Sequence, residues 1–305
     1  MNYRLTFTAF FIPLFWGCTS TSQEKQESHD GVIQIKTTSF PVDYLVRRLL
    51  PNAEVTCIIP KGEDPPDWNP TPETIADLQQ ATKIIANGAG FEKWMETASL
   101  PPSIIIYAEQ ALGTSDIITL AGEKTHSHGK KGEHSHAGKD PHIWSDPLLY
   151  QKQAVFIAQQ LKGVADETEI EANLTTLKAD LQGLHSALVA ATTQYKSVEF
   201  AANHPAYNYL AKRYELNVHS FDFDPEEPPT KEALDAFASW NQSSNAQQLL
   251  WEEMPSESVQ AVFPAGVQHI YIDPLEQPST DKYDYVQQMK KNITRIKQIP
   301  IKEND

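Results

Sequence analysis

The stretch Glu167–Thr193, ETEIEANLTTLKADLQGLHSALVAATT, repeats leucine or isoleucine at intervals of four, three, four, three and four residues. The repeated positions are Ile170, Leu174, Leu177, Leu181, Leu184 and Leu188. This spacing predicts one face of a single helix, about 40 Å long at 1.5 Å per residue. Such a helix is long enough to join two lobes, and because it resists bending we expect ligand binding to involve small shifts. His185 lies beside the stripe and is interpreted as structural.

Short apolar runs alternate with helix-like segments on both sides of this helix, as in parallel βαβ units. Before it, strands are expected at 32–35, 55–59, 84–86 and 104–107, and helices at 42–50, 73–81 and 91–98. After it, strands are expected at 198–202, 217–221, 248–251 and 269–272, and helices at 207–214, 231–240, 256–263 and 283–296. We therefore predict an α/β protein with two lobes, each a parallel β-sheet flanked by helices. The N-terminal lobe is expected at 32–162, the long rigid linking helix at 163–194 and the C-terminal lobe at 195–305.

Five histidines crowd the segment Lys124–Asp146, KTHSHGKKGEHSHAGKDPHIWSD, among glycine, lysine and serine. A segment this polar cannot pack as core, and short His-rich tracts are typical of metal binding because neutral imidazole is a good ligand for zinc and its neighbours. Four of the histidines form two pairs, His126 with His128 and His134 with His136. The pairing favours a metal-capture loop at 124–139 over histidines that occur there by accident.

The fifth histidine, His142, has different surroundings. It lies in Asp140-Pro-His-Ile-Trp-Ser-Asp-Pro, where the polar run gives way to an apolar helix that begins near Leu148. We interpret His142 as a candidate for a fixed, buried metal ligand.

The first residues predict export and attachment to a membrane. Arg4 gives a positive start, residues 5–16 are mostly apolar, and Gly17 precedes Cys18, as in a bacterial lipoprotein signal peptide (1–17) that is cleaved before a lipidated cysteine. The apolar run is shorter than the roughly 20 residues that span a bilayer. A signal peptide that is simply cleaved is the alternative. Residues 18–31 are mostly Ser, Thr, Gln, Glu and Lys and are expected to tether the fold to a membrane in the periplasm or at the cell surface.

The net charge of −15 argues against nucleic acid as a partner and against electrostatic attachment to anionic lipid. It suits a protein that collects cations. Once Cys18 is lipidated, Cys57 has no partner for an internal disulfide. Cys57 lies in an apolar, strand-like run, so we expect a buried, inert thiol.

Six short motifs follow one another along the chain. They are Thr38-Ser-Phe-Pro-Val-Asp-Tyr-Leu, Gly62-Glu-Asp-Pro with Pro70-Thr-Pro, Asn87-Gly-Ala-Gly-Phe-Glu-Lys-Trp, Asp140-Pro-His-Ile-Trp-Ser-Asp-Pro, His204-Pro-Ala-Tyr-Asn-Tyr-Leu and Ile272-Asp-Pro-Leu. In this order they resemble the zinc and manganese solute-binding proteins of ABC importers, the family that includes ZnuA and TroA. The resemblance implies two α/β lobes joined by one helix, with the metal in the cleft between them. The His-rich loop before D-P-H and the histidine of the third ligand motif resemble the zinc branch of the family.

Carried over onto this chain, the resemblance implies three metal ligands: His142 from the first lobe, and His204 and Asp273 from the second. Two imidazole nitrogens at about 2.0 to 2.1 Å and a carboxylate oxygen at about 2.0 to 2.2 Å are normal for zinc. His204 and Asp273 both follow expected strands, and open α/β sheets place ligands at the carboxyl ends of their strands.

One motif departs from the family pattern. The family's first ligand motif is G-x-D-P-H, whereas this chain has Gly62-Glu-Asp-Pro-Pro-Asp-Trp, with Pro66 in the place of the histidine. Three alternatives stay open: three protein ligands with a water, a fourth ligand from Asp67 or a loop histidine, or a changed metal preference. Glu252, at the end of the expected strand 248–251, is a further candidate, either as a ligand or as a partner that orients a histidine.

These patterns predict an extracytoplasmic lipoprotein that captures zinc, ahead of manganese, and delivers it to the permease of an ABC importer. We expect a monomer with no nucleic-acid partner and no enzymatic activity. Because catalytic zinc is also held by three protein ligands and an open water, a zinc-dependent hydrolase is an alternative. Glu252 is its one candidate base, and the chain has no H-E-x-x-H motif. A surface metal store or sensor without a transporter is the other alternative.

Overall fold

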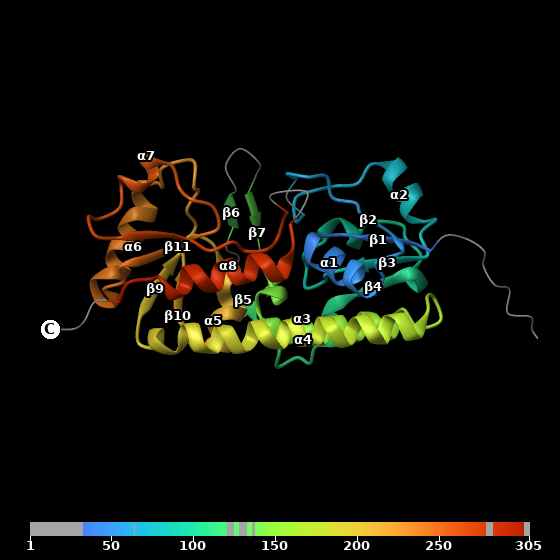
Figure 1. Ribbon diagram of the computed structural model, residues 1–305. Coiled ribbons are helices and arrows are strands. Elements are labelled where there is room, and N and C mark those ends of the chain that lie inside the picture. Colours follow the sequence, from blue (N-terminus) through green and yellow to red (C-terminus); the bar gives the residue numbers. More distant parts are fainter. Residues whose placement is uncertain are drawn as a thin grey trace, which may run out of the picture. The chain divides into compact units, whose positions relative to one another are not determined.

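The computed structural model describes residues 33–63, 65–120, 138–278 and 283–301, and the backbone of residues 125–127 and 133–135. The expected signal peptide and tether lie outside the described residues, as do Cys18, His128 and His136. The described residues belong to one compact unit. Two four-stranded parallel sheets form its frame (Figure 1).

The first sheet has the strand order β2-β1-β3-β4, with every neighbouring pair parallel. Its strands are β1 (Gln34–Thr37), β2 (Glu54–Cys57), β3 (Lys83–Ala86) and β4 (Ile105–Tyr107). The helical segments of this lobe are α1 (Phe40–Leu49), α2 (Pro72–Leu78), η1 (Lys93–Glu96), η2 (Pro102–Ile104), η3 (Ala108–Ala111), η5 (Ile143–Ser145) and α3 (Pro147–Gln160).

The second sheet has the equivalent order, β10-β9-β11-β12, and is also parallel throughout. Its strands are β9 (Glu199–Ala202), β10 (Asn217–Ser220), β11 (Gln248–Trp251) and β12 (Gln268–Tyr271). The helical segments of this lobe are η6 (Thr193–Tyr195), η7 (Pro205–Tyr207), α5 (Asn208–Tyr214), α6 (Lys231–Ser244), α7 (Glu257–Gln260) and α8 (Tyr285–Lys297). In both sheets the second strand pairs on one side of the first strand, and the third strand pairs on its other side. Open α/β sheets bind ligands in the crevice that forms at such a change of direction.

Two short antiparallel pairs lie between the fourth strand of the first sheet and Asp140. β5 (Thr119–Leu120) pairs with β8 (Gly138–Lys139), and β6 (Thr125–Ser127) pairs with β7 (Glu133–Ser135). In the second pair, His126 and His134 are register partners. The expected capture loop therefore contains a backbone hairpin.

The long helix α4 (Glu167–Thr192) joins the two sheets and runs past both of them (Figure 1). It begins where the Asp166 carboxylate accepts hydrogen bonds from the backbone N–H groups of Thr168 and Glu169, which is a normal N-cap. All six residues of the predicted stripe are buried. α4 contacts α1 and α3 of the first lobe and α5 and α8 of the second. The prediction of a two-lobed α/β fold with one long joining helix is confirmed.

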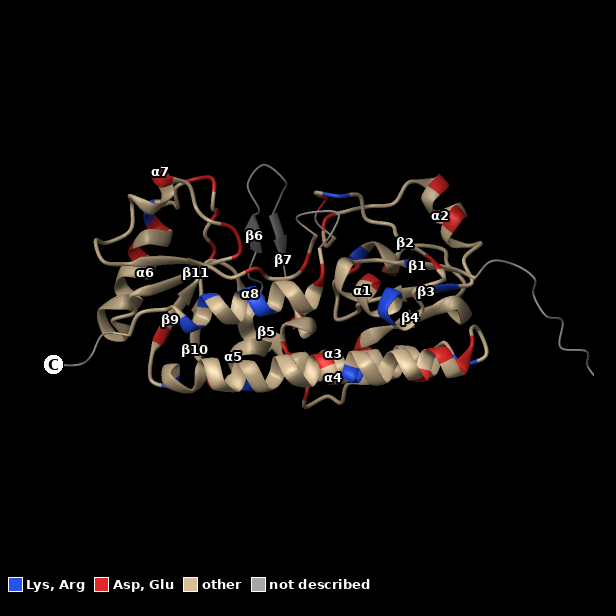
Figure 2. Ribbon diagram, in the orientation of Figure 1, with Lys and Arg blue, Asp and Glu red and all other residues tan. Residues whose placement is uncertain are grey.

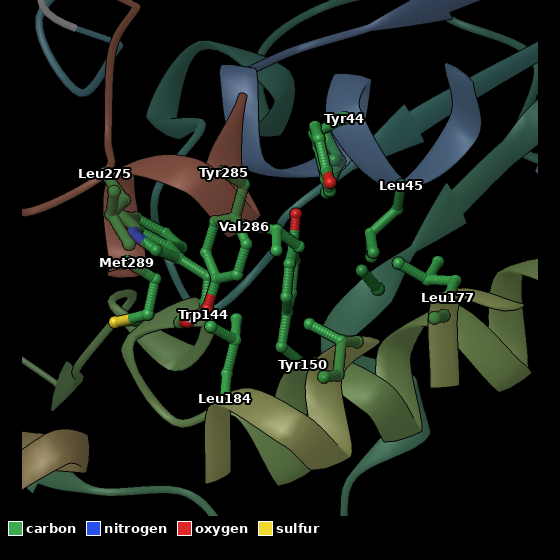
Figure 3. Packing of buried hydrophobic residues seen from close by; sticks show 14 of the residues in the cluster. Tyr44, Leu45, Trp144, Tyr150, Leu177, Leu184, Leu275, Tyr285, Val286 and Met289 are labelled. Carbon is green, nitrogen blue, oxygen red and sulfur yellow. Dashed lines mark hydrogen bonds between the residues drawn. The ribbon is translucent and has the colours of Figure 1, made fainter. Parts of the chain in front are cut away.

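The hydrophobic core is continuous across the lobes along α4 (Figure 3). Tyr285, at the start of α8, packs its ring against two other tyrosine rings in a tilted arrangement. Its ring centroid lies 4.5 Å from that of Tyr150 on α3 and 5.6 Å from that of Tyr44 on α1. The Tyr285 hydroxyl donates to the carbonyl oxygen of Trp144 at 2.6 Å. The last helix of the chain therefore packs against the first lobe, close to His142.

Two expected helices are much shorter than predicted. In place of 91–98, only the 3-10 turn η1 forms, because the carboxylate of Glu92 turns back onto the N–H groups of Asn87 and Gly88 and holds the chain in a tight loop. In place of 256–263, α7 covers only Glu257–Gln260, and Pro264, which has no N–H and disfavours helical geometry at the residue before it, stops the helix from continuing past Phe263. Among the described residues, no helix has the length and apolar character that a membrane span requires.

Candidate metal centre

His142 is the N-cap residue directly before the 3-10 turn η5 and is 1% exposed. Its ring Nδ1 lies 2.8 Å from Oδ1 of Asp140, and its backbone N–H donates to the same oxygen at 2.9 Å. In the neutral ring, a proton on Nδ1 that is donated to this carboxylate oxygen leaves the lone pair on Nε2. A histidine fixed in this way is the usual form of a metal-binding imidazole.

A second layer of contacts holds the backbone beside His142. Asn87, directly after β3, donates from Nδ2 to the carbonyl oxygen of Pro141 at 3.0 Å. The buried Glu92 accepts from the backbone N–H of Asn87 and of Gly88 and from the hydroxyl of Thr38. Gly88 is required in this loop, since its φ is +79° and a Cβ atom there would lie 2.6 Å from Cγ of Glu109. The N-G-x-x-x-E motif thus holds in place the backbone next to His142.

His204 follows the end of β9 in the second lobe and is also buried. Its neighbour Asn203 binds Glu252, which follows β11. The N–H of Glu252 donates to Oδ1 of Asn203 at 3.0 Å, and Nδ2 of Asn203 lies 3.3 Å from Oε1 of Glu252. Glu252 is therefore bonded to the residue directly before His204, and its role as a ligand or as a partner that orients a histidine stays a prediction.

The structure brings the two histidines together from different lobes. The ring centroids of His142 and His204 are 5.4 Å apart, and the rings are nearly perpendicular at 83°. Because His204 comes from the second lobe and His142 from the first, a metal bound by both would lie between the lobes.

Glu276 is a functional candidate that the sequence did not reveal. Its Oε2 lies 3.8 Å from Nε2 of His142, and its side chain is 13% exposed. Two ligand atoms of one tetrahedral zinc ion are about 3.4 Å apart, given bonds of about 2.0 to 2.2 Å. The observed separation needs only a small adjustment to reach that value. Glu276 thus places a carboxylate beside Nε2 of His142.

The turn that carries Glu276 is held by both lobes. The indole N–H of Trp144, two residues after His142, donates to the carbonyl oxygen of Pro274 at 2.8 Å. Leu275 has a φ of +63°, in the left-handed region that non-glycine residues seldom adopt. Such a conformation persists only where its surroundings impose it, and it is typical of binding sites.

Asp273, the carboxylate implied by the family resemblance, is 8% exposed and forms contacts within its own turn. Its Oδ1 accepts from the backbone N–H of Leu275 at 2.9 Å. Asn292 of α8 holds its backbone, accepting from the Asp273 N–H at 3.1 Å and donating to the Asp273 carbonyl oxygen at 2.8 Å. Asp273 shapes the turn that presents Glu276, and its role as a ligand stays a prediction.

The remaining candidates have the following positions. Pro66 is buried, and Asp67 beside it is half-buried on the turn after β2. The structure describes the backbone of His126 and His134, which pair in the hairpin. His128 and His136 lie outside the described residues. Asp67 and the loop histidines therefore stay predictions.

His185 has a contact that agrees with a structural role, whereas Cys57 is only half-buried and not fully buried as expected. Nδ1 of His185 lies 3.2 Å from the hydroxyl of Tyr214. Burial raises the pKa of the half-buried Cys57 thiol to about 11, which keeps it protonated and unreactive at neutral pH.

The electrostatic field at His142 favours a cation. Burial lowers the pKa of His142, but the hydrogen bond and charge of Asp140, together with the charges of Glu276 and Glu252, outweigh burial and raise it above the ordinary histidine value. The field that favours a proton there also favours a metal ion. In the ribbon of Figure 2, several loops of the second lobe are coloured as acidic residues, and many of the basic residues lie on helices.

Among the residues whose side chains are described, no three of His, Cys, Asp or Glu already stand in an arrangement that could hold a metal ion. The described side chains bring the pairs His142 with His204 and His142 with Glu276 together. Zinc binding by all three residues therefore requires side-chain adjustment.

Comparison with known sequences finds a matching family and several relatives that handle zinc. The ZnuA family, described as zinc-uptake complex component A, periplasmic, matches residues 35–299. The high-affinity zinc uptake system protein ZnuA of Bacillus subtilis is 28% identical over 290 residues, which is 91% of each chain. The zinc-binding lipoprotein AdcA of Streptococcus pneumoniae is 27% identical over 291 residues, and the match covers 90% of this chain but only 57% of AdcA.

Solved structures share the fold. The Zn(II)-bound ZnuA-like domain of Streptococcus pneumoniae AdcA has a TM-score of 0.73 at 24% identity, over 88% of this chain and 98% of that domain. The metal-dependent lipoprotein YcdH from Bacillus subtilis has a TM-score of 0.72 at 24% identity, over 87% of this chain and 98% of YcdH.

Proposed function

The chain belongs to the ZnuA family, and we propose that it captures zinc with His142, His204 and Glu276 and delivers it to the permease of an ABC importer. As a family member it is a metal-binding solute-binding component of an ABC uptake system, and the family is not enzymatic. The hydrolase and the store or sensor alternatives are therefore set aside.

The observation that supports this site best is the meeting of two buried imidazoles from different lobes, 5.4 Å apart between ring centroids, with a carboxylate 3.8 Å from Nε2 of one of them. Two imidazoles and a carboxylate are a normal donor set for zinc. A fourth position can be filled by a water, Asp67 or a loop histidine. Glu252 is proposed to act through Asn203 on the segment that carries His204.

The location of the protein is proposed from the sequence and its relatives. AdcA of Streptococcus pneumoniae is named a lipoprotein, and the family is described as periplasmic. We propose that Cys18 carries the lipid and that residues 18–31 tether a monomeric metal-binding unit outside the cytoplasm.

We expect the purified protein to prefer zinc to manganese by at least about tenfold, because imidazole-containing sites follow the Irving–Williams order, in which Mn²⁺ binds most weakly. The measurement is competition between the two ions at equal concentration, with bound metal determined by elemental mass spectrometry. In parallel, a strain lacking the gene should grow poorly with a zinc chelator and recover on added zinc. Preferential manganese binding, with growth recovered only by manganese, would contradict the choice of metal.

We expect the His-rich loop to serve capture more than retention, because several weak ligands raise the local metal concentration without a fixed geometry. Asn replaces all four histidines in this test (His126, His128, His134 and His136), so that the hairpin backbone and β8 remain. The variant should still bind one zinc ion tightly, but it should no longer bind further zinc ions weakly. It should also take up zinc more slowly when a chelator competes for the metal. In the native protein, the weak equivalents should disappear as the pH falls through about 6.5, since imidazole must be neutral to bind.

A matched control for this test replaces Lys130 and Lys131 of the same loop by serine, which should leave the weak equivalents in place. If the variant without the four histidines lost the tightly bound zinc ion, a loop histidine would be the fourth ligand, in place of the family histidine that Pro66 replaces.

A further inference from the structure

Residues of both lobes bind the carboxylate of Asp140, which is fully buried. Its Oδ1 accepts from the backbone N–H and from Nδ1 of His142. Its Oδ2 accepts from Nδ2 of Asn208 at 2.8 Å. Asn208 is the first residue of α5 in the second lobe, so one carboxylate connects the His142 turn to the opposite lobe.

We propose that Asn208 is a positioning residue for zinc, which fixes the Asp140 carboxylate so that His142 presents Nε2 to the metal. The inference rests on the proposed function, because it takes His142 as a zinc ligand. Groups that orient a metal-binding histidine commonly change metal affinity 10-fold to 100-fold when they are removed. Without Asn208, Oδ2 would lose its donor in a buried place, and the carboxylate would turn toward another donor at the expense of His142.

The position of Asn208 gives this contact a second consequence. Asn208 lies four residues after His204, and the short turn η7 joins the two. The hydrogen bonds from Asn208 through Asp140 to His142 therefore link the two histidines across the lobe boundary. The orientation of His142 depends on where the second lobe places α5.

Neighbouring contacts keep α5 in place when Asn208 is changed. The hydroxyl of Tyr209 donates to the carbonyl oxygen of Asp140 at 3.0 Å and accepts from the N–H of Ile118 at 3.1 Å. Nε of Arg213 lies 2.6 Å from Oδ2 of the buried Asp146. Variants of Asn208 should therefore fold and lose only the orientation of Asp140.

Two substitutions test whether Asn208 acts as a hydrogen-bond donor or only fills space. Asn208→Asp keeps the shape but replaces the amide donor by a carboxylate that repels Asp140, and a negative charge at a helix start does not weaken the helix. Asn208→Ala removes both shape and donor. If Asn208 acts as the donor, both variants should bind zinc about 10-fold to 100-fold more weakly, with Asn208→Asp at least as weak as Asn208→Ala.

The control is Asn173→Asp, which makes the same chemical change on α4. There Nδ2 donates to the carbonyl oxygen of Leu49 at 3.0 Å. Zinc affinity is measured by titration against a fluorescent chelator, and the geometry of the site by the visible absorption of the cobalt(II)-loaded protein. Asn173→Asp should match the native protein in both, whereas the Asn208 variants should bind weakly and give an altered cobalt spectrum, with apo-protein melting temperatures close to the native one.

Native affinity and spectrum in Asn208→Asp would overturn the inference, whether or not Asn208→Ala is weakened, because shape alone would then suffice. A native protein that fails to bind zinc in the same titration would instead overturn the proposed function.

Discussion

Replacing either His142 or His204 by alanine is expected to weaken zinc binding about a thousandfold or more, which corresponds to about 4 kcal/mol. Each residue would supply an imidazole, the ligand that dominates affinity for zinc. Both histidine side chains are buried, with 1% and 3% of their surface exposed. A water molecule that took the place of the imidazole ring would therefore have little contact with bulk solvent.

The same variants should lose the stabilisation that zinc gives to the folded protein. A ligand at a thousand times its Kd stabilises the native state by about 4.1 kcal/mol, which in a protein of this size is a rise in Tm of roughly 10 °C. Calorimetric titration and thermal unfolding with and without zinc measure both effects. His185→Ala is the matched control, since that histidine lies on α4 and contacts the hydroxyl of Tyr214. Unchanged affinity in both site variants, with the zinc-induced rise in Tm retained, would refute the assignment.

The second large effect is expected at Glu276. The substitution Glu276→Gln keeps the size of the side chain and removes its negative charge, so zinc affinity should fall at least about a hundredfold, or about 2.8 kcal/mol. Asp273→Asn should change affinity less than about threefold, because the amide oxygen of asparagine can still accept the hydrogen bond from the N–H of Leu275. Parallel zinc titrations of the two variants compare the two carboxylates directly.

The opposite ranking, with Asp273→Asn severe and Glu276→Gln mild, would restore the ligand set that the family resemblance implies. The Tm of the apo protein distinguishes this outcome from a folding defect. A ligand role for Asp273 requires weak zinc binding by a variant that keeps its native apo stability.

The leucine spacing in Glu167–Thr193 predicted the most important element of the fold, because a period of 3.6 residues on a long segment has few other structural solutions. The two parallel sheets were predicted for a similar reason, from apolar runs at the spacing of βαβ units. The packing of α8 against the first lobe was not predicted. An amphipathic pattern shows which face of a helix is buried, but it does not show which distant segment covers that face.

Two of the three proposed ligands could be singled out from the sequence. His142 and His204 each lie in a distinct motif after an identifiable element, and the structure places their rings together. Glu276 was missed although it lies only three residues after Asp273. Its direction depends on the left-handed backbone of Leu275, which packing imposes and which leucine itself does not signal. Asn208 was missed because its amide meets Asp140 only after the two lobes have packed together.

The continuity of α4 determines which parts of this chain can change length. Both lobes pack on one unbroken 26-residue helix, so the helix sets their relative rotation as well as their spacing. A single inserted residue would turn everything after it by about 100° and advance it by 1.5 Å, moving His204 away from His142. Adding about seven residues would restore the rotation but lengthen the helix by about 10 Å. The residue count of α4 is thus fixed by the need to keep His142 and His204 together, and among the described elements the loops can accommodate insertions and deletions more easily than this helix.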